Sequence, residues 1–137
     1  MRVVVNTTFA ITASVVTAFG TSSLYGKGHF DMEDVLNATL AGGVIVGSTS
    51  DMMKEAWGVF LLGALGGCIS VVGYHTIAPK LKGLFHDTCG VHNLHGIPGF
   101  LGGVTGAIFA YSLPDDGIES IFGARLKGRT SMEQGNM

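Results

Sequence analysis

Two histidines, His92 and His95, lie three residues apart in a stretch that holds no charged side chain. From Thr88 to Pro114 the sequence has no Asp, Glu, Lys or Arg, which is enough for a membrane-spanning helix of about 20 residues. Polar groups in hydrocarbon are costly, so they normally face the interior of a helix bundle or a water-filled path. An imidazole there can accept a hydrogen bond and relay a proton near neutral pH. The stretch therefore predicts a polar path with histidine chemistry.

Glycines continue the helix face on which the histidines lie. His92, His95, Gly99, Gly102 and Gly106 follow steps of 3, 4, 3 and 4 residues, a spacing that puts them on one face of an α-helix. This face carries imidazoles at one end and almost no side chain at the other. It predicts either the wall of a narrow passage or a very tight contact between helices.

Two other interpretations concern the same residues. A histidine bonded to a neighbouring helix is a common structural device, and this hypothesis stays open for His95. Cys89, His92 and His95 belong to residue types that bind zinc, but three such groups on one face, with only Asp87 as a carboxylate, do not make a closed site. We therefore expect no metal and no cofactor.

The composition is that of a membrane protein. The chain has 137 residues, of which 47% are hydrophobic and 13% charged, whereas ordinary globular domains are about 25% charged. Its 22 glycines suit closely packed membrane helices. The net charge of −2 provides no basic patch, so we expect no nucleic-acid partner. The predicted fold class is an all-α, polytopic membrane helical bundle.

Four apolar runs define the predicted elements. We predict spanning helices over residues 3–26, 32–50, 56–79 and 88–112, within a partial membrane domain at 1–114, and a polar loop or tail at 115–137. The first run also fits a secretory signal peptide, but it is long for one and lacks a clear cleavage site. The second run is short for a full span and is expected to use the turn before it to reach the membrane interface.

Small residues recur at helical spacing in these runs, as expected where helix backbones approach closely. Gly43 and Gly47 form a Gly-x-x-x-Gly pair in the second run. We predict helix packing at seven positions: Gly43, Gly47, Gly63, Gly67, Gly99, Gly102 and Gly106.

Polar residues near helix ends complete the prediction. Asp87 is the expected N-cap of the fourth helix, and Asp31, Glu33 and Asp34 lie where the N-terminus of the second helix favours negative charge. We expect His75 to be exposed at the interface.

Two segments resemble blocks of a known family. Asp87-Thr-Cys-Gly-Val-His-Asn-Leu-His-Gly-Ile-Pro-Gly99 resembles the signature of the Rh branch of the ammonium transporter family. Asn37-Ala-Thr-Leu-Ala-Gly-Gly-Val-Ile-Val-Gly47, with Asp51-Met-Met53 after it, resembles a second Rh block. The resemblance runs through nearly the whole chain. It covers only a C-terminal portion of a family member, which normally has eleven or twelve spanning helices.

The resemblance implies transport of ammonium or ammonia, and of carbon dioxide in some members, through a histidine-lined pore rather than an enzymatic activity. It assigns the role of the second pore histidine to His95, while the first pore histidine of the family belongs to an upstream helix that is not in this sequence. His92 is a weaker pore-lining candidate, and Asn93 is expected to bond another helix. The family is trimeric, so the resemblance implies a homotrimer in the lipid bilayer, at the plasma membrane.

Because half of the family's pore is absent from the sequence, two alternatives stay open. The chain can be a non-conducting, truncated subunit that associates with full-length relatives, since it carries the small-residue stripes that such association needs. It can also be an unrelated membrane protein of four helices.

Overall fold

The computed structural model describes residues 1–26, 28–84 and 87–112, so the tail predicted at 115–137 lies outside the described residues. Every regular element of this part is helical, which confirms the all-α class. The elements are α1 (Arg2–Tyr25), α2 (Met32–Ile45), α3 (Ala56–Val72), the π-helical turn η1 (Gly73–Ile77), α4 (Ala78–Leu81), the π-helical turn η2 (His92–Gly96) and α5 (Ile97–Ser112).

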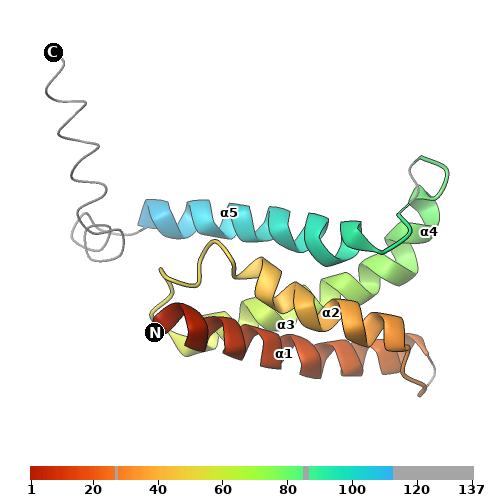
Figure 1. Cartoon of the computed structure of the whole chain (residues 1–137), viewed down its shortest axis with the longest axis horizontal. Helices are drawn as coiled ribbons and strands as arrows, with labels where there is room; N and C mark the ends of the chain where they lie inside the picture. Colours follow the sequence, from red (N-terminus) through yellow and green to blue (C-terminus); the bar gives the residue numbers. More distant parts are fainter. Residues whose placement is uncertain (27, 85–86, 113–137) are drawn as a thin grey trace, which may run out of the picture.

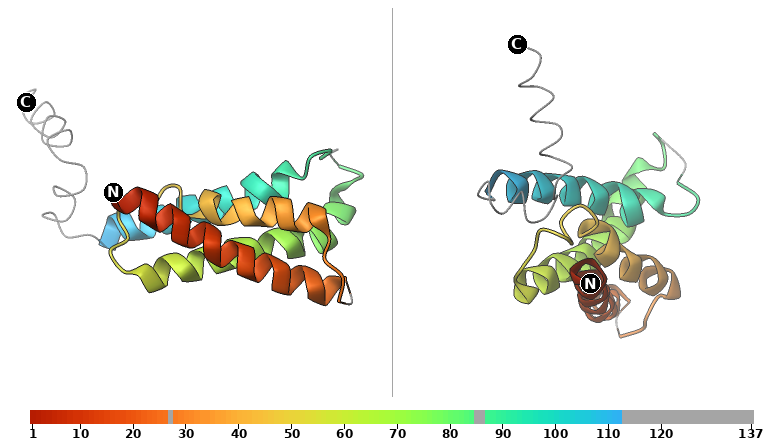
Figure 2. Two further views of the ribbon diagram at one scale, coloured as in Figure 1. Left: turned by 60° about the horizontal axis from the view of Figure 1, so that its bottom comes forward. Right: turned by 60° about the vertical axis from the view of Figure 1, so that its left-hand side comes forward.

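Four rods result from these elements, because η1 and α4 continue α3 and η2 leads into α5. α1 packs most extensively against α3 and α2, whereas α5 contacts chiefly α2. Figure 1 shows α1 and α5 on opposite sides, with α2 and α3 between them. The right view of Figure 2 also shows α5 apart from α1. The histidine-bearing rod therefore lies at an edge of the bundle, with one side packed and one side open.

Two of the rods are long and apolar enough to cross a membrane, judged by length and composition. They are Arg2–Tyr25 and Ala56–Leu81, and they coincide with the first and third predicted spans. Many large apolar side chains on the rods point outward, among them Leu24 and Phe100, which are 83% and 71% exposed. Such a surface is suited to lipid or to further helices, not to water.

The second predicted helix ends earlier than expected. α2 has 14 residues and ends at Ile45, which gives a length of about 21 Å against a hydrocarbon core of about 30 Å. Residues 46–52 form turns instead. The amide of Asn6 in α1 stabilises the connection that follows, because it donates to the carbonyls of Ser50 at 2.8 Å and Met53 at 2.9 Å. The absence of charge over 35–50 therefore did not fix where the helix ends.

Both π-helical turns precede a proline. The N–H of Ala78 donates to the carbonyl of Gly73, and Pro79 follows. In the same way the N–H of Ile97 donates to the carbonyl of His92, and Pro98 follows. Proline has no N–H and its ring crowds the carbonyl four residues earlier, so a wider turn just before it relieves the conflict. π turns are frequent at functional sites, and each of these contains a histidine.

Candidate functional site

The start of the histidine-bearing helix is held by Asp87. Its carboxylate accepts hydrogen bonds from the N–H of Val91 at 3.0 Å and of His92 at 2.9 Å. The side chain therefore caps the helix, but Asp87 is not the N-cap residue, which is Val91. Gly90 has a φ of +64°, in the left-handed region that favours glycine. A Cβ there would also lie 2.7 Å from the hydroxyl oxygen of Tyr74. Cap and glycine together fix the direction in which η2 begins.

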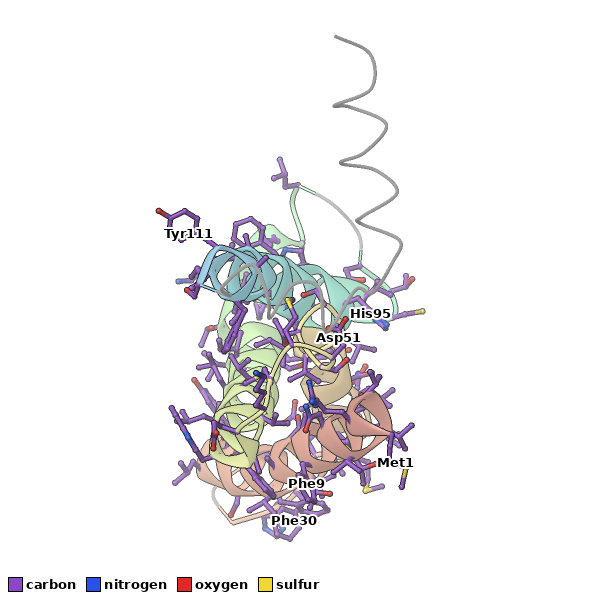
Figure 3. All side chains as sticks on the ribbon, turned by 90° about the vertical axis from the view of Figure 1, so that its left-hand side faces the viewer. Met1, Phe9, Phe30, Asp51, His95 and Tyr111 are labelled. Carbon is purple, nitrogen blue, oxygen red and sulfur yellow. The ribbon has the colours of Figure 1, made fainter. Side chains whose placement is uncertain are left out.

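The two histidines lie in η2 with different surroundings. His92 is half-buried and lines a small cavity of about 40 Å³ together with Lys82 and Asp87. His95 is exposed, and Figure 3 shows it at the edge of its helix rather than among the packed helices. Among the described residues, no group of three or more His, Cys, Asp or Glu side chains could hold a metal ion. His95 therefore offers an open imidazole on the outer side of the rod.

The predicted face of histidines and glycines is divided in two. His95 and Gly99 are exposed, whereas Gly102 and Gly106 are buried. An α-helical spacing was assumed throughout, but η2 is wider than an α-helix, so the histidines in it lose their common phase with the glycines of α5. Gly99 lies in α5 with Gly102 and Gly106, and it is exposed where the contact with α2 is looser. Of the two possibilities for this face, the glycine end makes a tight helix contact and only the histidine end is open.

The tight contact joins α5 to the end of α2 and the turn after it. A Cβ on Gly102 would lie 2.5 Å from the carbonyl oxygen of Ile45, and one on Gly106 would lie 2.9 Å from the hydroxyl of Ser48. Ser48 also donates to the carbonyl of Gly102 at 2.6 Å. Gly99 has a looser neighbour, Val44, at 3.8 Å. Because α2 ends at Ile45, the residues after it form the polar turn against which α5 packs.

Two glycines of α3, Gly63 and Gly67, face α1. A Cβ on Gly63 would meet the backbone of Ala10, and one on Gly67 would lie 2.6 Å from the carbonyl oxygen of Ser14. These two residues are buried, so the backbones of α1 and α3 approach closely along this stripe.

The predicted pairing of Gly43 with Gly47 is wrong. Gly43 is half-buried and a Cβ on it would lie 3.4 Å from the side chain of Ile11, but Gly47 is exposed in the turn beyond α2. The Gly-x-x-x-Gly spacing has packing meaning only while the helix continues, and α2 stops at Ile45. Gly42 occupies the tighter position, against Ser14.

A buried polar cluster joins three rods at the end of the bundle where η1 lies, and the sequence did not predict it. Asp34 is buried in the first turn of α2. It accepts a hydrogen bond from the hydroxyl of Ser22 at 2.9 Å and contacts Nε2 of His75 at 2.7 Å. The ring of Tyr25 stacks on that of His75, with 4.8 Å between ring centroids. We refer to Ser22, Asp34 and His75 as the acid–histidine cluster.

One expectation about these residues is corrected. His75 is not simply exposed at an interface, because its side chain is 32% exposed and bound to a buried carboxylate. Asp34 lies in the first turn of α2 as expected, but Asp31 is the N-cap and accepts from the N–H of Glu33 at 2.9 Å, whereas the Asp34 side chain binds Ser22 and His75. A signal was present: a second acid in the first turn of an apolar helix that a capping acid already precedes.

Asn93 also differs from expectation. It is fully buried and contacts another rod, since a Cβ on Gly73 of η1 would lie 2.6 Å from its side-chain oxygen. Within the described residues its amide makes no hydrogen bond. The predicted bond to another helix is therefore replaced by close packing against a glycine.

The long apolar rods and the close glycine contacts are those of a helical membrane protein. A family model described as the Ammonium Transporter Family matches residues 1–134. The chain belongs to this family, which confirms the resemblance and places the chain among membrane transporters rather than enzymes.

The similar proteins are Rh proteins. The chain is 44% identical to the ammonium transporter Rh type B of Mus musculus, over 95% of this chain and 30% of the relative. It is 44% identical to the ammonium transporter Rh type B-A of Xenopus laevis, over 97% of this chain and 31% of the relative. Its fold matches a chain solved in work described as "Nitrosomonas europaea Rh50 and mechanism of conduction by Rhesus protein family of channels", with a TM-score of 0.76, 41% identity, and coverage of 93% of this chain and 32% of that chain. The chain thus spans about a third of the length of these relatives.

Proposed function

We propose that this chain supplies the C-terminal portion of a membrane path for ammonium or ammonia, in which His95 lines the path. The observation that carries the proposal is the family match over residues 1–134, together with the exposure of His95 on the open side of η2. A ring that faced the packed core would instead have supported a purely structural role. His92 lies three residues before His95 and is half-buried, so it is the weaker candidate for lining the same path.

The chemistry of an imidazole suits this role. Ammonium loses its hydration in a dry passage, and a charged group without hydrogen-bond partners is very costly there. A neutral imidazole accepts with one ring nitrogen and donates with the other, so it can replace part of the lost hydration and hand on a proton. Whether ammonia, ammonium or carbon dioxide crosses is set by the whole path, to which this chain contributes one wall.

In the proposed arrangement all four rods cross the bilayer. α2 does so together with the turn at 46–52, and the fourth span runs through η2 and α5. The exposed apolar side chains of the rods face lipid or the segments that the relatives carry outside the matched third. A homotrimer at the plasma membrane is part of the same proposal.

The proposal is tested by a transplant. In the Rh type B protein of Mus musculus, the matching third is replaced by this chain, and methylammonium uptake is measured in transporter-deficient cells. We expect uptake above background, because the transplanted rods restore the missing wall. Background uptake by a chimera that reaches the surface in normal amount would contradict the proposal.

The alternative function, a non-conducting subunit, is favoured by the exposed apolar side chains of the rods, which leave a surface for a partner helix, whereas the glycine stripes are used inside the chain. It predicts that the 137-residue chain copurifies with full-length Rh type B and lowers its uptake. If the chain neither binds nor inhibits the full-length relative, this alternative is excluded.

A further inference from the structure

We propose that the acid–histidine cluster is a positioning site for the histidine-bearing turn: it holds η1 in place, and η1 in turn holds η2, where His92 and His95 lie. The inference deepens the proposed function and rests on it only where transport is concerned. It assigns a role to Ser22, Asp34 and His75, which are remote in sequence from the histidines they position.

The first step is the clamp between α2 and η1. An ionised carboxylate only accepts hydrogen bonds, so Asp34 receives one from the hydroxyl of Ser22 and one from Nε2 of His75. Ser22 belongs to α1 and His75 to η1, so one buried acid ties three rods together. Because Asp34 is buried, the fold depends on both hydrogen bonds, since a buried charge that loses a partner is strongly destabilising. Tyr25 restricts the imidazole further by stacking on it.

A second clamp lies beside the first. The hydroxyl of Tyr74 donates to the carboxylate of Glu33 at 2.6 Å. Glu33 and Asp34 are neighbours in α2, and Tyr74 and His75 are neighbours in η1. Two adjacent acids of one helix therefore fix two adjacent residues of the π turn, which sets both the position and the rotation of η1.

The third step leads from η1 to η2. The ring of Tyr74 lies against Gly90, at the point where the helix direction is set. Gly73 lies against the fully buried Asn93, which follows His92 directly. Neither contact has slack, since a Cβ at Gly73 would lie 2.6 Å from the Asn93 oxygen and one at Gly90 would collide with the Tyr74 ring. A shift of η1 must therefore move or loosen η2.

The proposal competes with a simpler one, in which the cluster only staples α1, α2 and α3. The two are distinguished by asking whether loss of the hydrogen bond to Asp34 disturbs η2 as well as the packing of α1, α2 and α3. We therefore compare variants that lose this bond with a variant that keeps it. His75→Leu removes the donor, whereas His75→Gln keeps a side-chain N–H that can reach the carboxylate. Ser22→Ala is a milder variant that removes one bond and leaves only a small gap, so it also serves if His75→Leu does not fold.

The experiment follows the ring ¹⁵N signals of His92 and His95 in the full chain, labelled with ¹⁵N-histidine and held in lipid nanodiscs. Amide exchange over residues 90–96 and 58–67 is measured in parallel. We expect His75→Leu to shift the two ring signals and to speed exchange over 90–96 by about two- to thirtyfold, with exchange over 58–67 unchanged. Ser22→Ala should act in the same direction but less, and His75→Gln should restore the native signals.

Unchanged ring signals and unchanged exchange over 90–96 in His75→Leu or Ser22→Ala would overturn the proposal, and so would equal effects of His75→Leu and His75→Gln. These readouts do not depend on transport. If they behave as expected while His95→Ala leaves uptake unchanged in the chimera, the coupling stands and only the pore role of His95 fails.

Discussion

Gly102→Leu is expected to undock the histidine-bearing helix from the rest of the bundle. A Cβ at this position lies 2.5 Å from the carbonyl oxygen of Ile45, and backbone cannot turn aside as a side chain can. We expect a loss of about 3 kcal/mol from the packing of α5. The loss is measured as faster amide exchange over residues 97–112 of the chain in nanodiscs.

Gly103→Leu is the matched control. It makes the same chemical change one position along, where a Cβ meets nothing within 4 Å. We expect a change within about 0.5 kcal/mol. Native protection of α5 in Gly102→Leu, or equal effects of the two variants, would show that α5 does not rest on Ile45 as described.

Gly63→Leu is expected to separate the two most extensively packed rods. A Cβ on Gly63 would lie 2.6 Å from the Cα of Ala10, so the new side chain meets the backbone of α1 directly. We expect a destabilisation of about 3 kcal/mol or more, seen as a lower midpoint of thermal unfolding by circular dichroism in detergent.

A leucine at Gly20 provides the comparison for this interface. Gly20 lies on α1 itself and a Cβ there has open space around it. Gly20→Leu should unfold at the native temperature or above, because leucine has the higher helix propensity. The account of the α1–α3 contact is contradicted if Gly63→Leu also unfolds at the native temperature.

Much of the fold could be predicted from local patterns. The uncharged runs predicted the long first and third rods, and Asp87 was recognised as a residue whose side chain caps the fourth helix, although it is not the N-cap residue. The family blocks at 37–47 and 87–99 identified the family that the match over residues 1–134 confirms. These features depend on residues close in sequence, which is why a sequence reveals them.

The rest depends on contacts between distant residues. The helix α2 ends at Ile45, and the connection after it is held by Asn6 of another rod. Asp34 binds His75, which lies 41 positions later in the sequence. No periodic pattern of residues predicts such a pair. The π turns could be predicted only in part, since Pro79 and Pro98 marked the places where an α-helix is disturbed but not how it adapts. For that reason the histidines of η2 do not share one α-helical face with the glycines of α5.

The most direct test of the central claim is methylammonium uptake by the chimera carrying His95→Ala, with His29→Ala as control. His29 is exposed in the connection between α1 and α2, so its loss removes a histidine without touching the proposed path. We predict that His95→Ala lowers uptake about five- to hundredfold at normal surface expression, the effect expected when the transported species loses one hydrogen-bond partner in the proposed path. Uptake equal to that of His29→Ala would contradict the assignment of His95 to the path.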